Sequence, residues 1–242
     1  MSFRSYAMSK GIYEFEKSNL NKSKIYTEDI VYEHINTIFS AHERLKGCFI
    51  PINNLVNKMF EDFKVSELFL KQDIEKYKQN SKNELEDKIL AHGYKFLYRI
   101  QNILDVISST NYENIILRSM KSREICVYNV NLNEIYTGSN SSIYVKNIDE
   151  FCENILEYDY IKFLIKVKRS NSNIDFMRHC AYVCSKEKFE INSYNFILAC
   201  VSFPYEFIRV ISKYRDLGRN LSNYSDKLNF DSVLEKDGES II

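Results

Sequence analysis

Residues 125–164, ICVYNVNLNEIYTGSNSSIYVKNIDEFCENILEYDYIKFL, decide how this chain folds. An apolar, β-like run opens the stretch, a polar turn over residues 138–142 follows, and a second β-like run comes after it. Beyond the second run, apolar residues recur at helical spacing, at Tyr160, Phe163, Leu164 and Val167. The pattern predicts a β-hairpin that leads into a helix.

Helical spacing also dominates the part of the chain before this stretch. Thr27 is a favourable N-cap for a helix that ends at Gly47, because two acidic residues follow it in the first turn. Pro51 suits the first turn of a second helix, for which we predict a bend near Lys64. Together these signals predict a helical first third of the chain.

The longest helix is predicted to begin at Ser81, with Glu84 completing a capping box. The spacing predicts further helices over residues 111–121, 174–183, 191–201 and 203–215. The fold class is therefore mainly α (α+β), with roughly seven to nine helices around one small β-hairpin.

Composition restricts the classes of protein that fit. The chain has 242 residues, of which 45% are hydrophobic, and its 33 basic residues balance its 33 acidic ones. With this balance the chain has no net positive charge that would attract nucleic acid or an anionic membrane. No run of about 18 apolar residues occurs, and the N-terminus lacks a signal-peptide core, so we expect a cytoplasmic protein without a membrane span. The 6 cysteines show no CxxC spacing, which favours reduced thiols.

Three segments are expected along the chain. Residues 1–26 are polar and are predicted to be a poorly ordered arm or the remnant of a lobe. Residues 27–217 carry the helical pattern and form the predicted domain. Residues 218–242 are rich in glycine, asparagine, serine and charge, which predicts a flexible tail.

Several motifs, in this order, resemble those of a known family. They are INTIFSAHERLK (35–46), ILDVISSTNYENIILRSM (103–120), EICVYNVNLNE (124–134), IYVKNIDEFCENILEYDYIKFL (143–164) and FILACVSFPYEFIRVISKYR (196–215). The chain resembles the CotS-type spore-coat kinase-like proteins, which belong with aminoglycoside phosphotransferases and choline kinases. The resemblance covers roughly residues 28–216. It implies the helical C-terminal lobe of the protein-kinase-like fold, with the N-terminal lobe absent.

The resemblance also implies roles for particular positions. The family's catalytic Asp falls on Asn129, its metal-binding Asn on Glu134, and the first Asp of its DFD motif on Asn147. The family's other acidic positions and its histidine are kept here as Asp149, Asp159 and His42. The family's His and Gly that precede the catalytic Asp are replaced by Val127 and Tyr128.

These departures argue against catalysis. An amide such as Asn129 cannot accept the proton of a substrate hydroxyl, and Asn147 offers Mg²⁺ only a neutral oxygen. About 27 residues precede the first helix, too few for a five-stranded nucleotide-binding lobe. We therefore predict no catalytic residue, no cofactor, no bound metal and no nucleotide, with Asn129, Glu134, Asn147 and Asp149 as degenerate family positions.

Other residues admit a functional and a plainer interpretation. Glu134 and Asp149 fit either a residual metal pair or two solvated carboxylates, and the second is favoured. The cysteines and histidine of residues 179–184 fit a zinc site only with a fourth ligand, so buried thiols are favoured. Cys126 lacks an adjacent histidine and fits a core thiol better than a nucleophile.

Two basic clusters fit either a nucleic-acid surface or a solvated rim, and the rim is favoured. They comprise Lys162, Lys166, Lys168 and Arg169, and Arg209, Lys213, Arg215 and Arg219.

The function predicted first is that of a non-catalytic, pseudokinase-like structural or interaction protein. The resemblance implies a spore-coat component, made in the mother-cell cytoplasm and then carried to the coat, with other coat proteins or a second copy as partners. One alternative is a small-molecule phosphotransferase completed by another lobe. The other is a helical regulatory or nucleic-acid-binding protein.

Overall fold

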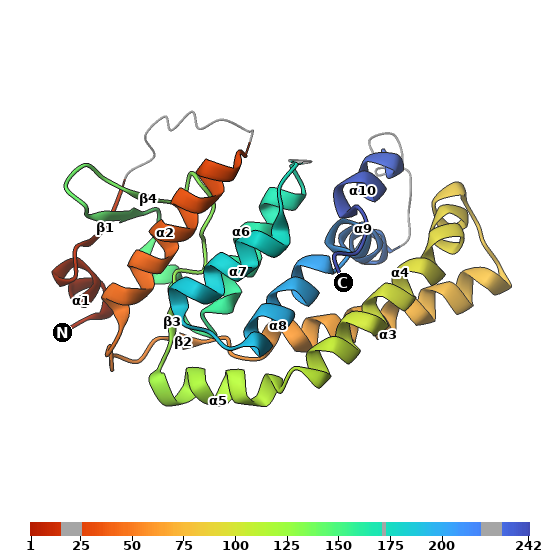
Figure 1. The fold of residues 1–242 in the computed structure, drawn as a ribbon. Helices are drawn as coiled ribbons and strands as arrows, with labels where there is room; N and C mark the ends of the chain where they lie inside the picture. The colour runs from red at the N-terminus through yellow and green to blue at the C-terminus, as the bar shows by residue number, and fades with distance from the viewer. Residues whose placement is uncertain (16–25, 171–172, 219–228) are drawn as a thin grey trace.

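The computed structural model describes residues 1–15, 26–170, 173–218 and 229–242 (Figure 1). Within these residues, ten α-helices and one 3-10 helix form most of the fold, which confirms the mainly α class. The helices are α1 (Phe3–Ser9), α2 (Glu28–Leu45), α3 (Lys58–Gln79), α4 (Glu84–Ser109), α5 (Tyr112–Ser122), η1 (Ile148–Glu150), α6 (Glu157–Lys168), α7 (Phe176–Glu187), α8 (Ile191–Ser202), α9 (Tyr205–Asp216) and α10 (Phe230–Asp237).

Two three-stranded sheets occupy one end of the molecule. The first has the order β1 (Ile12–Glu14), β5 (Ile143–Val145), β4 (Ile135–Thr137), and the second β2 (Asn53–Asn54), β6 (Cys152–Glu153), β3 (Ile125–Cys126). Strands β4 and β5 are antiparallel and form the predicted hairpin, whereas the start of the first apolar run, β3, pairs with β6 instead. The described strands thus extend well beyond the single hairpin that we predicted.

Helices α3 and α4 lie side by side at the other end (Figure 1). Gly93 makes this close approach possible, because a Cβ atom there would lie 2.9 Å from the Ile74 side chain. The predicted N-cap of α4 is wrong by two residues. The side chain of Asn83, rather than that of Ser81, accepts the Glu86 N–H, and α4 then runs without interruption to Ser109.

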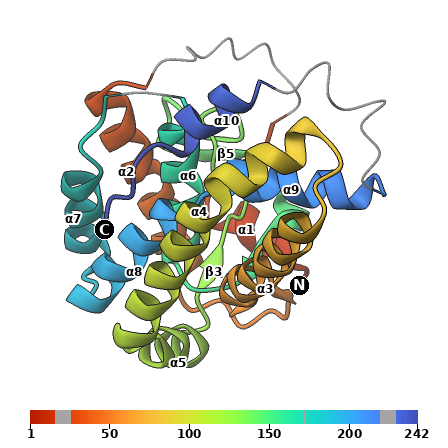
Figure 2. The same cartoon turned by 90° about the vertical axis from the view of Figure 1, so that its right-hand side faces the viewer.

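Helix α8 is the core helix of the domain. Every residue from Phe196 to Ser202 is buried, and α8 packs against α4, α6 and α7 (Figure 2). In the described part of the chain, no single helix is long and apolar enough to cross a membrane. Helices α8 and α9, bent by 51° at their junction, reach the required length and apolarity only as a pair.

The segment after Pro51 differs from its prediction. It does not begin a helix: residues 53 and 54 form β2, and Asn57 adopts a left-handed conformation with φ 72° before α3 begins at Lys58. Asparagine tolerates this conformation, so Asn57 forms a turn before α3. The proline alone led us to predict a helix start at Pro51 and gave no sign of this turn. Helix α3 then continues through Lys64 to Gln79 as one helix.

Both ends of the chain contain more structure than predicted. Of residues 1–26, described apart from residues 16–25, α1 and β1 are ordered, and β1 pairs in parallel with β5 through Ile12 and Ile143. Ile12 is fully buried. The segment is ordered despite its polar sequence because β1 joins the sheet of β5 and β4 and buries a few apolar side chains there.

At the other end, the prediction of a flexible tail covered residues 218–242, of which residues 219–228 lie outside the described part. Helix α10 follows and packs against α9. The Asp237 carboxylate accepts the N–H groups of Glu206 and Phe207 at 2.9 and 2.7 Å, and so caps the first turn of α9. This long-range cap fixes the C-terminal segment to the domain.

Candidate functional site

The loop between β3 and β4 carries Asn129 and Glu134, the first two positions to which the resemblance assigns a catalytic or metal-binding role. Tyr128 has φ 72°, an uncommon conformation for a bulky residue, and it turns the chain so that the Asn129 N–H reaches the Val127 carbonyl at 2.9 Å. The Asn129 side-chain amide donates to the Glu150 carboxylate. The position to which the resemblance assigns the catalytic base therefore holds a hydrogen-bond donor engaged by a neighbouring acid.

Glu134 closes the same loop. Its carboxylate accepts the side-chain amide of Asn131 and, at 3.3 Å, the Asn131 N–H. Lys146 Nζ lies 3.8 Å from the other oxygen of Glu134. Glu134 thus acts in the structure as a turn-forming side chain with a basic neighbour.

Asn147 and Asp149 lie together at the start of η1. The Asn147 side chain accepts the Asp149 N–H at 3.0 Å and caps this short helix. Arg4 of α1 donates to the Asp149 carboxylate at 2.8 Å and also pairs with Glu14. Asp149 and Glu134 therefore each face a cation of the chain itself, Arg4 and Lys146.

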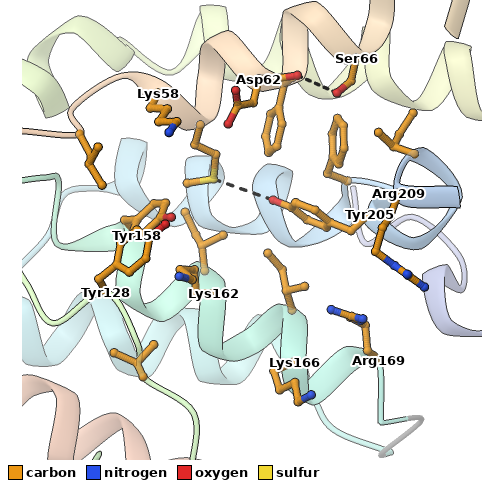
Figure 3. Close-up of a pocket in the computed structure, with 18 of the residues that line it drawn as sticks. Lys58, Asp62, Ser66, Tyr128, Tyr158, Lys162, Lys166, Arg169, Tyr205 and Arg209 are labelled. Carbon is orange, nitrogen blue, oxygen red and sulfur yellow. Dashed lines mark hydrogen bonds between the residues drawn. The ribbon is translucent and has the colours of Figure 1, made fainter. Parts of the chain in front are cut away.

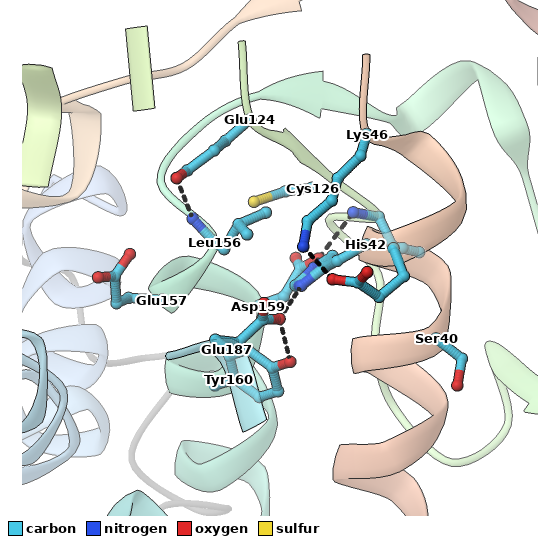
Figure 4. A network of polar contacts seen from close by, with 12 residues as sticks. Ser40, His42, Lys46, Glu124, Cys126, Leu156, Glu157, Asp159, Tyr160 and Glu187 are labelled. Atoms are coloured by element: carbon cyan, nitrogen blue, oxygen red, sulfur yellow. Dashed lines mark hydrogen bonds and ion pairs between the residues drawn. The ribbon is translucent and has the colours of Figure 1, made fainter. Parts of the chain in front are cut away.

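A buried network supports the loop from below (Figure 4). His42 Nε2 lies 3.0 Å from Asp159, and Nδ1 lies 2.8 Å from Glu187, which also accepts the Tyr160 hydroxyl at 2.5 Å. Burial disfavours charge on His42, but the hydrogen bonds to the two carboxylates outweigh it and raise its pKa to about 10. Burial likewise opposes ionisation of Glu187, yet the contact with His42 leaves its pKa lowered. An imidazolium therefore bridges two buried carboxylates.

Asp159 transmits this support to the loop. Its two oxygens accept the backbone N–H groups of Val127 at 2.7 Å and Tyr128 at 3.0 Å. Cys126, just before the loop, donates its thiol to the Ile155 carbonyl at 3.1 Å, and burial raises its pKa well above the ordinary value. Among the described residues, His42, Cys126 and Asp159 are the one set whose ligand atoms are close enough for a metal, but these hydrogen bonds already satisfy them.

A second network holds the strand before the loop. Arg118 donates to Glu124 at 2.8 Å and to Glu157 at 2.6 Å, and Glu157 accepts the Ser193 hydroxyl at 2.5 Å. Glu124 in turn accepts the Leu156 N–H at 3.2 Å. The two networks hold the start of the loop and the strand that precedes it. The local sequence of the loop identifies neither Glu187 nor Arg118 as a participant.

The two cysteines of α7 differ in burial: Cys180 is buried and Cys184 is partly buried. His179 Nε2 lies 2.6 Å from Glu28, and burial lowers the pKa of His179. Burial raises the pKa of Cys184 to about 12 and that of Cys180 further still. These side chains fit a helix packed against the core, as favoured from the sequence.

A cavity of about 650 Å³ opens beside the loop, between α3, α6 and α9 (Figure 3). Lys162, Lys166 and Arg169 of the first basic cluster line it, together with Arg209 of the second. Lys168 is turned away and donates to the Val201 carbonyl at 3.3 Å, and Arg219 lies outside the described residues. Lys166, Arg209 and Lys213 are exposed, as a solvated rim requires, and Lys166 and Arg209 also line this cavity.

No protein-family model and no curated protein matches the chain. Among solved structures, the crystal structure of an aminoglycoside phosphotransferase from Alicyclobacillus acidocaldarius subsp. acidocaldarius DSM 446 is similar, with a TM-score of 0.66 and 14% identity. The match covers 86% of this chain and 61% of that chain, so this chain spans about three-fifths of that protein's length. The likeness shows a mainly α, kinase-like fold of the aminoglycoside phosphotransferase type.

Proposed function

We propose that this chain is a non-catalytic kinase-like protein that acts by binding other proteins, as a component of the spore coat. The observation that carries the proposal is the state of Asn129. It stands where the resemblance assigns the catalytic base, and its amide donates to Glu150. A carboxamide has no basic oxygen for a substrate proton, so this group has no general-base role.

The surroundings of Asp149 support the same proposal. Asp149 has the acidic side chain that a metal-bound nucleotide would require, but Arg4 donates to it at 2.8 Å. Both side chains are exposed, so water competes for the pair and it contributes little to stability. Its effect is to place a positive charge where the family's chemistry would place a divalent cation.

Exposed apolar side chains support binding of a protein partner. Val65, Leu68 and Phe69 share one face of α3, and Tyr94 and Tyr98 share one face of α4. Leu68 is 53% exposed and Tyr98 66% exposed. Exposed apolar side chains that share a helix face are typical of interaction surfaces.

Calorimetry with ATP and Mg²⁺ tests the absence of catalysis. We expect no binding heat at millimolar nucleotide for the wild-type chain, for Asp149→Ala, or for Arg4→Ala, which removes the competing cation. The similar aminoglycoside phosphotransferase, measured in the same buffer, is the positive control. Saturable binding that Asp149→Ala abolishes would instead support the alternative function, a phosphotransferase. The hydrogen bonds from the Val127 and Tyr128 N–H groups to Asp159, which hold the loop backbone, are the observation that favours this alternative.

Sedimentation and pull-down experiments test the interaction. We expect the wild-type chain to self-associate or to retain coat proteins, and Leu68→Lys with Tyr98→Lys to weaken that association. Glu113→Lys, at an exposed position of α5, is the matched control because it changes the surface charge by the same amount. A monodisperse wild-type monomer that retains no partner would contradict the proposal.

Fractionation of spores tests the location. A tagged chain expressed in an endospore-forming host should be enriched in the coat extract over the mother-cell cytosol. Its confinement to the cytosol would contradict the spore-coat part of the proposal while leaving the non-catalytic part standing.

A further inference from the structure

The cavity between α3, α6 and α9 has the size of a small-molecule site. Its volume of about 650 Å³ lies within the range of about 300–1,000 Å³ usual for such sites. Figure 3 shows side chains of α3 on one wall and those of α6 on the other. The cavity is therefore a concave volume rather than a flat surface for a macromolecule.

The charged residues that line the cavity are mostly basic. The cations are Lys58, Lys162, Lys166, Arg169 and Arg209, and the carboxylates are Asp62 and Glu206. Glu206 is engaged by both arginines, Arg209 at 2.6 Å. Within the described chain the three lysines form no ion pair with a carboxylate, so the cavity has an excess of positive charge that a bound anion would neutralise.

Lys162 is held in place on the cavity wall. Its Nζ lies 3.6 Å from the centroid of the Tyr128 ring and 5.4 Å from that of Tyr158. The two rings are stacked, with centroids 5.7 Å apart. This arrangement positions the ammonium group without neutralising its charge, which leaves it available to a ligand.

The remaining lining suits an apolar body. Phe63 and Phe203 are stacked with ring centroids 4.0 Å apart and an interplanar angle of 7°. Met59 lies beside them and accepts the Tyr205 hydroxyl at 3.8 Å. These buried rings and the thioether form an apolar floor that suits the apolar part of a ligand.

We infer that this cavity binds a small amphiphilic anion, with an aromatic or apolar body and a phosphate or carboxylate group. Lys162 and Lys166 contact the anionic group, and Phe63, Phe203 and Met59 hold the body. This activity goes beyond the proposed function and does not depend on it, since it uses none of Asn129, Asn147 and Asp149.

The distribution of the other basic residues disfavours nucleic acid as the ligand. Lys168 is turned toward the Val201 carbonyl, and Arg215 pairs with Asp73 at 3.0 Å. A nucleic-acid surface requires a continuous row of accessible cations for successive phosphates. Four cations of the two basic clusters instead line one cavity.

Calorimetry with matched naphthyl compounds tests the inference. The probes are 1-naphthyl phosphate, 1-naphthoate, 1-naphthol and 1-naphthylmethylamine, all titrated in EDTA into the full chain. We expect one of the anions or both to bind saturably, at least about tenfold tighter than the neutral and cationic compounds, and more weakly at high salt. Because no nucleotide or metal is present, the result is separate from the ATP experiment.

Variants then assign the site. Lys162→Met keeps the packing on Tyr128 but removes the charge and should weaken binding of the anion about tenfold or more, whereas Lys162→Arg should retain it. Lys71→Gln, at an exposed position of α3 outside the cavity, should leave binding unchanged. Thermal unfolding verifies that each variant folds. Equal binding of all four probes, no binding at millimolar anion, or unchanged binding in folded Lys162→Met would overturn the inference.

Discussion

His42 Nε2 lies 3.0 Å from Oδ2 of Asp159, although 117 positions separate the two residues in the sequence. Both side chains are fully buried. Through Asp159 the contact extends to the N–H groups of Val127 and Tyr128, so α2, α6 and the loop are joined by one polar connection. This connection supports the backbone of the loop from two helices that are far from it in the sequence.

Replacing His42 should cost much of the stability of the domain. His42→Gln retains a similar volume but removes the cation between Asp159 and Glu187, which leaves two buried carboxylates uncompensated. We expect the free energy of unfolding in urea to fall by about 3–5 kcal/mol. His92→Gln, at a partly exposed position on α4, is the matched control and should change it by less than about 1 kcal/mol. Equal effects of the two substitutions would show that the network does not stabilise the fold.

Two buried groups should give the stability opposite dependences on pH. The pKa of His42 is about 10 in the folded state and about 6.5 unfolded, so its contribution is complete below pH 6.5 and decreases as the pH rises toward 10. Burial and the nearby Arg99 charge lower the pKa of Lys168 to about 7, from about 10.5 unfolded. The unfolded chain then holds the extra proton, and this contribution increases with pH above 7.

We therefore expect the wild-type stability to change little between about pH 7 and 8.5, below the range where thiols titrate. In Lys168→Met the stability should fall as the pH rises, by up to about 1.4 kcal/mol per pH unit, and in His42→Gln it should rise. Urea unfolding of the three proteins at several pH values checks this. Parallel profiles for all three would contradict the assignment.

The role of Asp159 should be visible in amide hydrogen exchange. In Asp159→Asn, one of the two acceptor oxygens becomes an NH₂ group that faces a backbone donor. We expect the amide of Val127 or Tyr128 to exchange at least about tenfold faster, which corresponds to ~1.4 kcal/mol. The amides of α8, such as that of Ile197, report global unfolding and correct for it. Acceleration of all amides by the same factor would contradict a local role.

Features that depend on neighbouring residues could be predicted from the sequence. The polar turn of the β4–β5 hairpin and the Thr27 cap of α2 each depend on side chains within a few positions, and both are present. The motif resemblance likewise named His42 and Asp159. The fold class follows from helical periodicity, which most of the chain displays.

Features that depend on distant residues could not be predicted in this way. Glu187 completes the buried network from the last turn of α7, and Arg4 reaches Asp149 from α1. Asp237 caps α9 across 31 positions. Each of these contacts joins two segments that are far apart in the sequence. The local sequence of each segment predicts only a helix or a polar chain terminus, and the two segments meet only in the folded protein.

The N-terminal segment provides the sharpest test of such a long-range contact. Ile12 is fully buried where β1 pairs with β5, and Tyr13, its neighbour on the other face of the strand, is only partly buried. We expect Ile12→Ala to lower the free energy of unfolding by about 2–5 kcal/mol, because it removes core contacts and leaves a cavity. Tyr13→Ala keeps the same backbone pairing and should cost clearly less. Urea unfolding of both variants compares them. A loss below about 0.5 kcal/mol for Ile12→Ala would mean that the segment behaves as the weakly ordered arm that its polar sequence suggests.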